Sequence, residues 1–543
     1  MKKFGLICMM LLFSSNFVFG QTVVEQSKKA EKLKNSGNYA EAFSAYEAYL
    51  FTPDLPLNGI VSGMNHSLEC LQELSRLKES DAFIDKVLEV HGEHVQVVTS
   101  FARARLSLPP WGYKIVGEFE RGHHRGGGEA ADSRERDRSR ALQMLAEALP
   151  RAADAPADVA AGFYEVLVEA LAVNRMAGGA WRLQELGDLE KLADYGEGTP
   201  WWGWRSYGNS EEEGAAPVTA EGDPVYYRLP ESWEKAANDG ERWRWSIGQL
   251  EKLGHEESAR EHLAKFAINQ FGTETLKRYG SVFTSDRLSK SEWSLHTLEE
   301  DETVAHLASG VKRFKLPDDY NYMRHASKLA ETKSTWAERL AKLYQNRRQF
   351  AAAAEAWQSA IDKYGKEKWR TEALDQIVKP WVSIESAPSQ TPVNAASFDL
   401  IYRNATGVEF TVRAIDTEAL LNGIQKLLKR NPSTIDWWKL QVENLGYRIA
   451  EGDGHRYLKD KVAVWREELQ PRENHFDARK TITAPAPLPP GAYQIAAKAD
   501  DGNEARAIIW IADTVLMRKT LTLKDNKNTD AQELIIVLDA ETG

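Results

Sequence analysis

The stretch FDLIYRNATGVEFTVRAID, residues 398–416, decides the fold class, because the hydrophobic period of the chain changes there. Apolar residues alternate with polar ones from Phe398 to Tyr402 and again from Val408 to Ala414, with turn residues at 404–407 between them. A period of two is typical of a strand that is buried on one face. We therefore expect a β-hairpin here.

A helical pattern follows this hairpin. Leucine and isoleucine side chains between Leu420 and Leu428 form one stripe of a helix that Thr417 caps. Ser433 and Asp436 then have the spacing of a capping box, which predicts a second helix. The sequence thus predicts a mixed α/β module at 397–475.

The last part of the chain returns to a strand pattern. Alternation begins at Gly491, turns at 500–503 and runs back to Ile511, which predicts a second hairpin. Further strands are expected at 516–523 and 534–538. These strands make up a β-strand module at 476–543.

The front of the chain is helical in pattern, with apolar residues recurring every three or four positions and few alternating stretches. Two segments, 30–53 and 336–364, place small and large residues where the two helices of a helix–turn–helix pair interlock. The residues are Ala30, Leu33, Gly37, Tyr39, Ala42 and Tyr46 in the first, and Leu340, Ala341, Tyr344, Phe350, Ala353, Trp357 and Ala360 in the second. Both resemble tetratricopeptide repeats, and 254–266 is a fainter third candidate.

Two stretches have the composition of linkers. Residues 121–140 are rich in glycine and charge and poor in apolar side chains, which favours an exposed loop. Residues 380–396 contain Pro388 and Pro392 and close the helical part. We therefore expect helical regions at 21–120 and 141–379.

The N-terminus has the pattern of a cleavable signal peptide at residues 1–20. Lys2 and Lys3 precede an apolar run, and small residues end at Gly20. That run is shorter than the ~20 residues of a membrane-spanning helix, and no later stretch is apolar enough to span a bilayer. No cysteine stands at the cleavage point for lipid attachment. The expected location is secreted or periplasmic, without membrane insertion after cleavage.

The net charge and the cysteine content argue against a nucleic-acid-binding protein and against a disulfide-rich protein. A net charge of −11 argues against a nucleic-acid partner, whose phosphates require a basic face. Cys8 lies in the signal peptide, which leaves Cys70 unpaired and gives no disulfide framework. A lone cysteine in an exported protein can be a nucleophile, but the apolar neighbours of Cys70 favour a buried, inert thiol.

No cluster of residues has the spacing of a catalytic, cofactor-binding or metal site. His255-Glu256 begins like a zinc-protease helix, but the next histidine is His262, whereas the motif needs the second histidine four residues after the first, so a solvated helix surface is expected. His123 and His124 lie in the glycine run without a partner at ligand spacing. Asp525 to Asp530 lacks the central glycine of a calcium loop. We therefore expect no enzyme activity and no cofactor.

The C-terminal part resembles the start of bacterial alpha-2-macroglobulin family proteins. The strings that carry the resemblance are FDLIYRN (398–404) continuing to Asp416, LPPGAY (488–493), AIIWIAD (507–513) and VLDAETG (537–543). The resemblance covers about the last 150 residues, and the helical front looks like an extension that some bacterial members carry. It implies macroglobulin-type β-sandwich domains, the last of them incomplete.

The resemblance also implies a protease trap, in which a bait segment is cut and the molecule closes around the protease, often with a thioester cross-link. A thioester needs cysteine followed two residues later by Glu-Gln, whereas CLQE (70–73) has these letters in another order, so no thioester is assigned. Because the sequence stops at Gly543, within a turn that should feed another strand, we expect an N-terminal fragment without the bait region.

The leading hypothesis is therefore an exported, non-enzymatic protein that resembles the N-terminal portion of an alpha-2-macroglobulin-type endopeptidase inhibitor, with proteases or other proteins as partners. The alternative is a periplasmic or cell-surface scaffold whose helical repeats bind peptides or envelope proteins. A third hypothesis is a hydrolase that acts on envelope polymers, which would need a cleft of paired carboxylates. The sequence leaves the oligomeric state open.

Overall fold

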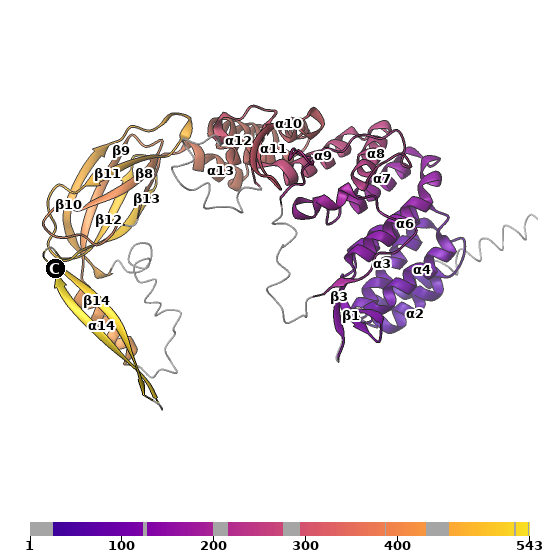
Figure 1. The fold of residues 1–543 in the computed structure, drawn as a ribbon, viewed down its shortest axis with the longest axis horizontal. Coiled ribbons are helices and arrows are strands. Elements are labelled where there is room, and N and C mark those ends of the chain that lie inside the picture. Colours follow the sequence, from indigo (N-terminus) through magenta and orange to yellow (C-terminus); the bar gives the residue numbers. More distant parts are fainter. Residues whose placement is uncertain are drawn as a thin grey trace, which may run out of the picture. The chain divides into compact units, whose positions relative to one another are not determined.

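The computed structural model describes residues 25–122, 127–198, 215–274, 294–385, 387–429, 456–525, 528–540 and 542. Figure 1 shows its helices and strands. The chain divides into two compact units, Met1–Thr332 and Lys333–Gly543. Helices dominate the first unit, and three helices followed by antiparallel sheets form the second. The predicted fold class, a multidomain chain with helices followed by β modules, is confirmed.

The first unit is built mainly from helices that pack against their neighbours in sequence. A helix at 25–35 begins it. The other helices are α2 (Tyr39–Leu50), α3 (Leu57–Glu73), α4 (Ser80–His91), α5 (Val95–Ser107), α6 (Arg134–Ala153), α7 (Ala157–Ala172), α8 (Asp239–Lys252), α9 (Glu256–Phe271) and α10 (Tyr322–Ala330). Short 3-10 helices are η1 (Leu77–Glu79), η2 (Ala177–Gln184), η5 (Leu295–Thr297) and η6 (Asp318–Tyr320).

Both predicted helix pairs are present. In the first, Ala30, Ala42 and Tyr46 are buried, so the alanines allow close approach and the tyrosine fills the space beside them. The second consists of α11 (Ser334–Asn346) and α12 (Phe350–Tyr364), and α13 (Lys368–Val378) packs beside α12. The fainter candidate at 254–266 forms most of α9, which packs against α8 and α10.

The described residues of the helical front also include six short strands, which the helical pattern did not predict. They are β1 (Trp111–Ile115), β2 (Glu118–Arg121), β3 (Glu129–Asp132), β4 (Gly196–Glu197), β5 (Glu302–Leu307) and β6 (Gly310–Lys315). The first four form a sheet in the order β2-β1-β3-β4, and β5 and β6 form a hairpin.

The predicted linker at 121–140 is also wrong over most of its length. Its described residues complete β2, form β3 and begin α6, and 123–126, with His123 and His124, lie outside the described residues. The charges of Arg121 and Asp137 are buried against each other. A charge-rich sequence can therefore be ordered and buried when its charges are paired.

The second unit contains a β-sandwich of two antiparallel sheets. One sheet has the order β10-β9-β12-β13 and the other has the order β11-β8-β7. The strands are β7 (Trp381–Ile384), β8 (Ser397–Arg403), β9 (Gly407–Ile415), β10 (Leu458–Glu468), β11 (Ala478–Thr483), β12 (Gly491–Ala499) and β13 (Glu504–Ile511), with a 3-10 helix η10 (Glu473–His475) between β10 and β11. The inward rows of both sheets form one continuous hydrophobic core.

The strands predicted at 398–416 exist, but they do not form a hairpin. β8 and β9 lie in different sheets. Their apolar rows face each other across the core, with the rings of Phe398 and Phe410 5.5 Å apart. Alternation indicates which face of a strand is buried, and it does not determine the neighbouring strand.

The predicted module boundaries do not separate modules in the structure. β8 pairs with β11 and β9 pairs with β12, so the two modules at 397–475 and 476–543 share one sandwich. The expected linker at 380–396 begins with β7, which pairs with β8, and Val382 is buried in the core. Pro388 and Pro392 lie after this strand.

Two other sequence predictions hold. The hairpin β12–β13 turns at 500–503 as expected. Helix α14 (Thr417–Leu428) forms as predicted. Its capping residue is Asp416 rather than Thr417, because the Asp416 carboxylate accepts a hydrogen bond from Ala419 N at 2.9 Å. The predicted helix at Ser433 lies outside the described residues.

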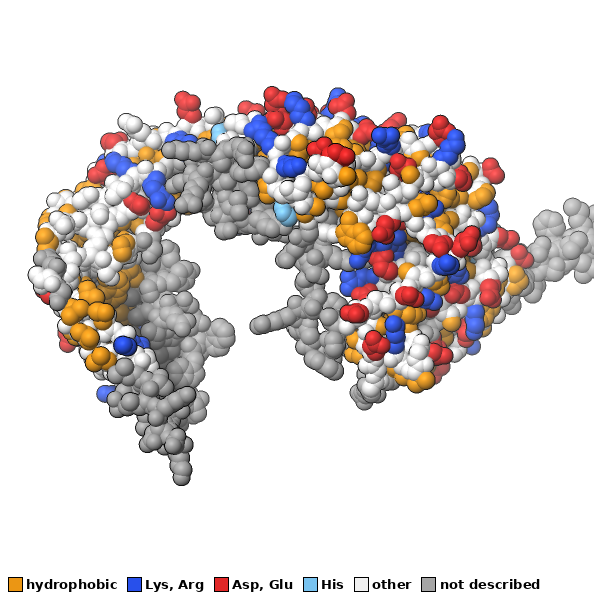
Figure 2. Space-filling view, in the orientation of Figure 1, with side chains coloured by type: hydrophobic (Ala, Val, Ile, Leu, Met, Phe, Trp, Pro, Cys, Tyr) orange, Lys and Arg blue, Asp and Glu red, His pale blue; other side chains and the backbone are white. Residues whose placement is uncertain are grey.

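A long two-stranded ribbon follows the sandwich. It consists of β14 (Thr514–Asp525) and β15 (Asn528–Asp539), so the strands predicted at 516–523 and 534–538 are present. Within the described part of the chain, β14 and β15 pair with each other and form no larger sheet. Figure 2 shows apolar side chains gathered on the surface over this ribbon.

The predicted signal peptide lies within residues 1–24, outside the described residues. None of the described helices combines the length and apolar character needed to cross a bilayer.

Candidate functional site

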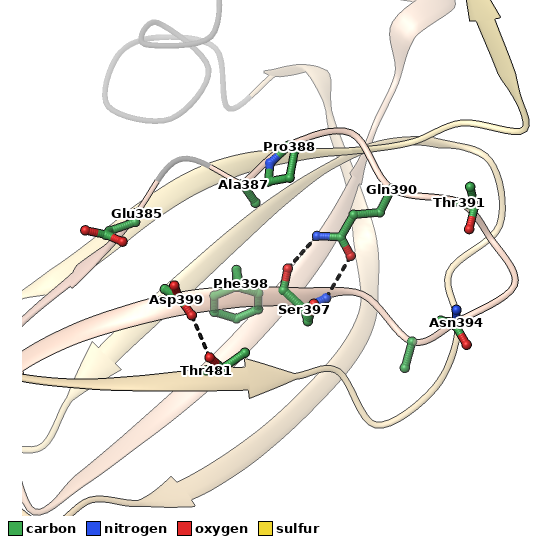
Figure 3. Close-up of a pocket in the computed structure, with 11 residues that line it drawn as sticks. Glu385, Ala387, Pro388, Gln390, Thr391, Asn394, Ser397, Phe398, Asp399 and Thr481 are labelled. Atoms are coloured by element: carbon green, nitrogen blue, oxygen red, sulfur yellow. Dashed lines mark hydrogen bonds between the residues drawn. The ribbon is translucent and has the colours of Figure 1, made fainter. Parts of the chain in front are cut away.

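An open pocket of about 470 Å³ lies where β7 leaves the sheet (Figure 3). β7 ends at Ile384, and Glu385 N makes one more hydrogen bond to Asp399 O at 2.9 Å before the chain turns away. The start of β8 therefore has no strand beside it on this side. The pocket is lined by Glu385, Ala387, Pro388, Gln390, Thr391, Asn394, Ala395, Ser397, Phe398, Asp399 and Thr481.

Gln390 takes the place of the missing strand. Its side-chain Oε1 accepts a hydrogen bond from Ser397 N at 2.9 Å, and its Nε2 donates to Ser397 O, as a neighbouring peptide group would. Its backbone pairs with the other sheet, because Gln390 N donates to Trp510 O at 2.9 Å and Ala512 N donates to Gln390 O at 2.8 Å. Gln390 thus joins the two sheets at the rim of the pocket.

The charges at the pocket are partly neutralised by one arginine from β11. Arg479 Nη2 lies 2.7 Å from Glu385 Oε1, and Nη1 lies 3.9 Å from Asp399 Oδ2. Asp399 Oδ1 also accepts a hydrogen bond from Thr481 Oγ1 at 2.7 Å. The lining residues include carboxylates, hydroxyls and amides but no histidine, cysteine or lysine. These groups can donate and accept hydrogen bonds to a polar ligand.

A second open pocket, of about 720 Å³, lies where α13 meets the sandwich. Trp381 and Arg403 both line it, and the Arg403 guanidinium lies 5.7 Å from the Trp381 ring centroid. Arg403 Nη1 also donates to Gln376 O at 2.9 Å, and Asn404 Nδ2 donates to Ile377 O at 2.7 Å. These bonds satisfy carbonyl groups at the end of α13, so they hold the helix against the sandwich.

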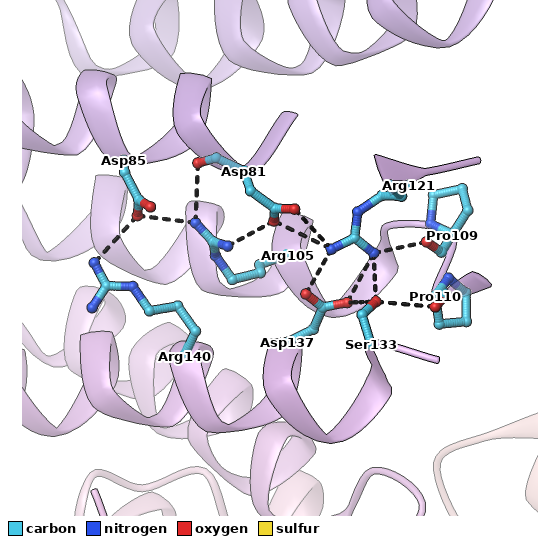
Figure 4. Close-up of polar contacts among 9 residues, drawn as sticks. All are labelled: Asp81, Asp85, Arg105, Pro109, Pro110, Arg121, Ser133, Asp137 and Arg140. Carbon is cyan, nitrogen blue, oxygen red and sulfur yellow. Dashed lines mark hydrogen bonds and ion pairs between the residues drawn. The ribbon is translucent and has the colours of Figure 1, made fainter. Parts of the chain in front are cut away.

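A buried charge network connects several elements of the first unit (Figure 4). Arg121 donates to both carboxylate oxygens of Asp137, at 2.8 and 2.9 Å, and to Asp81. Burial alone would lower the pKa of Arg121, but the hydrogen bonds and charges of Asp137 and Asp81 outweigh burial and raise it. Burial disfavours the charged form of the Asp137 carboxylate, and this effect is larger than that of its hydrogen bonds, so the pKa of Asp137 is raised.

The network continues from Asp81 to α5 and α6. Arg105 bonds Asp81 at 2.8 Å and Asp85 at 3.0 Å, and Arg140 reaches Asp85 at 3.2 Å. Arginines and aspartates thus pair in series and connect α4, α5, α6 and β2. Because every charge of this network faces a partner of opposite sign, we assign it a structural role.

His262 does not lie on a solvated helix surface, in contrast to the expectation from sequence. Its Nε2 lies 2.6 Å from Glu165 Oε2, and Ser258 donates to the same carboxylate, which links α9 to α7. Burial would raise the pKa of Glu165, but the bonds from His262 and Ser258 lower it. His255 and Glu256 are exposed. Across the described ranges, no three His, Cys, Asp or Glu side chains are grouped so that they could hold a metal ion.

Cys70 lies within α3 and is buried, as its apolar neighbours predict. Burial raises the pKa of its thiol, which disfavours the reactive thiolate.

Sequence patterns did not reveal either pocket. The first combines the segment from Glu385 to Asp399 with Thr481, which is 82 residues from Asp399 in sequence and meets it only in the folded sheet. Gln390 was placed in a linker, and no local pattern indicates that its amide replaces a strand.

Comparison with known proteins gives little further information. No family model matches the chain, and no curated protein matches it. Two solved structures are similar. One is native alpha-2-macroglobulin from Escherichia coli spanning domains MG0-NIE-MG1, with 15% identity, a TM-score of 0.19, and coverage of 31% of this chain and 47% of that chain. The other spans domains NIE-MG1, with 13% identity, a TM-score of 0.18, and coverage of 30% of this chain and 89% of that chain. The match therefore spans less than half of the first structure, and at these TM-scores neither likeness supports an argument about fold or function.

Proposed function

We propose that this chain is an exported, non-enzymatic protein-binding scaffold of the alpha-2-macroglobulin type, which supplies the helical front and the first sandwich of an endopeptidase inhibitor. Its partners would be proteases.

The observation that supports this proposal is the position of the resembling sequence strings in the sandwich. The string at 398–416 covers β8 and β9, LPPGAY (488–493) enters β12, and AIIWIAD (507–513) covers most of β13. Three of these strands, β9, β12 and β13, are adjacent in one sheet. Strings that are separate in sequence therefore contribute to a single core, as expected if they belong to one domain type.

The string LPPGAY also has a defined local structure. Tyr493 OH donates a hydrogen bond to Pro489 O at 2.8 Å, while the Tyr493 ring is buried in the core of the sandwich. The tyrosine thereby fixes the entry of the chain into β12. A structural requirement of this kind explains why the string would be kept as a unit.

The proposal can be tested by incubating the full chain with endoproteases of trypsin, chymotrypsin and elastase specificity. We expect a stable complex on size-exclusion chromatography and reduced cleavage of a protein substrate by at least one protease. If every protease cuts the chain, no complex forms and protein-substrate cleavage is unchanged, the inhibitor proposal fails. A heat-unfolded sample of the same chain provides the control for simple substrate competition.

A second candidate function is a helical scaffold that binds peptides or envelope proteins. It is favoured by the helix pair at 25–50 and by α11–α12, whose interlocking small and large residues are those of repeat proteins. Pull-down from an envelope extract distinguishes the two. A specific partner that is lost when residues 21–380 are deleted supports the scaffold, and a partner retained by the sandwich alone contradicts it.

A further inference from the structure

The second pocket, beside α13, combines an exposed tryptophan with polar side chains. Trp381 lies on β7, the strand at the end of its sheet. Its neighbour Val382 is buried in the core, so alternation along the strand turns the Trp381 side chain outward, where it is 36% exposed. Single exposed tryptophans are common on protein surfaces, but this one lines a pocket of about 720 Å³, which is within the size range of ligand sites.

One wall of this pocket, the turn between β12 and β13, is fixed to β7. Asn503 accepts a hydrogen bond from Val382 N at 2.8 Å and donates one to Val382 O at 2.9 Å. A Cβ atom at Gly502 would lie 2.5 Å from Pro380 O, so glycine is needed for the turn to approach the strand this closely. The turn thereby holds the exposed Asp501 carboxylate at the pocket before any ligand arrives.

Helix α13 contributes further polar groups. Glu372, Asp375 and Lys379 are spaced three and four residues apart, so they share one face of the helix, and all three line the pocket. Asp375 is paired with Lys379 at 2.7 Å. The Glu372 side chain is 59% exposed and lies 3.7 Å from Lys368 Nζ, so its carboxylate is open to a ligand. Carboxylates accept hydrogen bonds and an ammonium group donates them, so the pocket offers both kinds of partner.

The charges of the pocket restrict the kind of ligand that fits. Its lining contains three carboxylates and two cations, so its net charge is small. The Arg403 guanidinium already lies 5.7 Å from the Trp381 ring centroid, so like charge opposes a second cation at this ring. A purely apolar ligand would remove the charged groups from water without giving them partners. The pocket therefore suits a neutral ligand that has both polar and apolar surface.

We propose that this pocket binds a carbohydrate, with one sugar ring stacked on the exposed part of Trp381. In a β-linked chain of glucose-type sugars the ring substituents are equatorial, so each ring has a flat face of C–H groups. Such a face packs on the electron-rich face of an indole, while the hydroxyl groups at the ring edge bond Asp501, Glu372 and Lys379. Because the pocket is open, further sugars of the chain extend beyond it. This inference is independent of the proposed function.

The test is isothermal titration calorimetry of the full chain with cellotetraose and with chitotetraose, two soluble oligosaccharides with β-1,4 linkages. We expect at least one of them to bind with a dissociation constant of about 1 mM or below. Trp381→Ala should raise this constant about tenfold or more, because the stacking surface is lost. Asp501→Asn should raise it about threefold or more. Asparagine tolerates the φ of +51° at this position, so the turn is kept.

Trp369→Ala provides the matched control. Trp369 lies on α13 and is 42% exposed, but it does not line this pocket, so the dissociation constant should stay within about twofold of the native value. Circular dichroism verifies that each variant is folded, and Asp501→Asn tests the site even if Trp381→Ala unfolds the chain. Absence of binding for both oligosaccharides overturns the proposal. So does equal weakening by Trp369→Ala and Trp381→Ala, native affinity in Asp501→Asn, or tighter binding of tetralysine than of either oligosaccharide.

Discussion

Two amide side chains complete the backbone hydrogen bonding where strands of the sandwich end. Gln390 binds both backbone groups of Ser397, and Asn503 does the same for Val382, with Val382 N to Oδ1 at 2.8 Å and Nδ2 to Val382 O at 2.9 Å. In each case an amide occupies the position of a peptide group in a strand. The two residues thereby close the β7 side of the sandwich, where a free edge would otherwise remain.

We predict that Gln390→Ala lowers the free energy of unfolding of the sandwich by about 1–3 kcal/mol, since Ser397 loses both partners. Urea unfolding followed by tryptophan fluorescence measures the change. Thr391→Ala, which alters the neighbouring pocket residue, is the control and should change stability by less than about 0.5 kcal/mol. Equal stability of the two variants would show that water replaces the amide without cost.

The burial of His325 leads us to predict that the stability of the native state depends on pH. It is buried in α10, its Nε2 contacts Asp319 O, and its pKa is lowered below the ordinary value of 6.5, mainly by burial. Arg260 and Arg244 lower the pKa further, while Asp319 opposes them. As pH falls through about 6.5, the unfolded chain takes up a proton before the native one does, so the native state loses stability below this pH.

The expected result is that His325→Gln reduces the fall in thermal midpoint between about pH 7.5 and 5.5. Part of the fall should remain, because burial also lowers the pKa of His66. His255→Gln, at an exposed position, should behave like the native chain. A variant with an unchanged pH dependence would exclude His325 as the titrating group.

Among the elements, the hairpin β1–β2 depends on the buried charges that hold it to the helices. Arg121 at the end of β2 has a side chain that is 1% exposed, and it bonds Asp137 of α6 and Asp81 of α4. Removing one partner of a buried ion pair leaves the other charged and unpaired, which costs more than the pair itself contributes.

Arg121→Met should therefore destabilise the first unit by about 3 kcal/mol or more. The double variant Arg121→Met/Asp137→Leu should recover part of this loss, because it removes one of the stranded carboxylates. Arg103→Met is the matched control. Its pair with Glu169 is about half exposed, so the cost should stay below about 1 kcal/mol. Chemical denaturation of the three variants measures the loss of stability in each. Equal losses for Arg121→Met and Arg103→Met would contradict the prediction.

The same elements show what sequence could and could not predict. Helices with an interlocking pattern, such as α11 and α12, were predictable, because their period and their small residues are local signals. The segment at 121–140 was misread because charged side chains look solvated until their partners from α4 are known. The β5–β6 hairpin was missed although Ser309-Gly310 is a turn signal, and Gly310 adopts a φ of +108° there.

For the whole molecule, the order of helices before sheets was predictable because the period changes near residue 397. The arrangement of the strands in a single sandwich was not predictable. Period-two alternation identified β8 and β9 as strands, but their partners β11 and β12 are 76 to 91 residues away in sequence, as for Leu400 with Lys480. The pocket beside Gln390 depends on the same long-range pairing. It could be recognised only after the sheets were known.

The division into two units leads to a prediction about the second one. Within it, Arg403 and Asn404 bond the carbonyl groups at the end of α13, and Asn404 Oδ1 lies 2.9 Å from His475 Nδ1 of the loop before β11. The polypeptide 333–543 should therefore fold by itself, with α11 to α13 and the sandwich unfolding together.

We expect the far-ultraviolet circular dichroism of 333–543, which reports mainly the helices, and its near-ultraviolet signal, which reports the packed aromatic residues, to show one common thermal midpoint. Asn404→Ala should lower that midpoint for both signals by several degrees, because Ile377 O and Lys379 O lose a donor. Asn394→Ala, at an exposed position beside the first pocket, should leave it unchanged. Helices that melt before the sandwich in the native sequence would mean that these bonds do not couple the two parts.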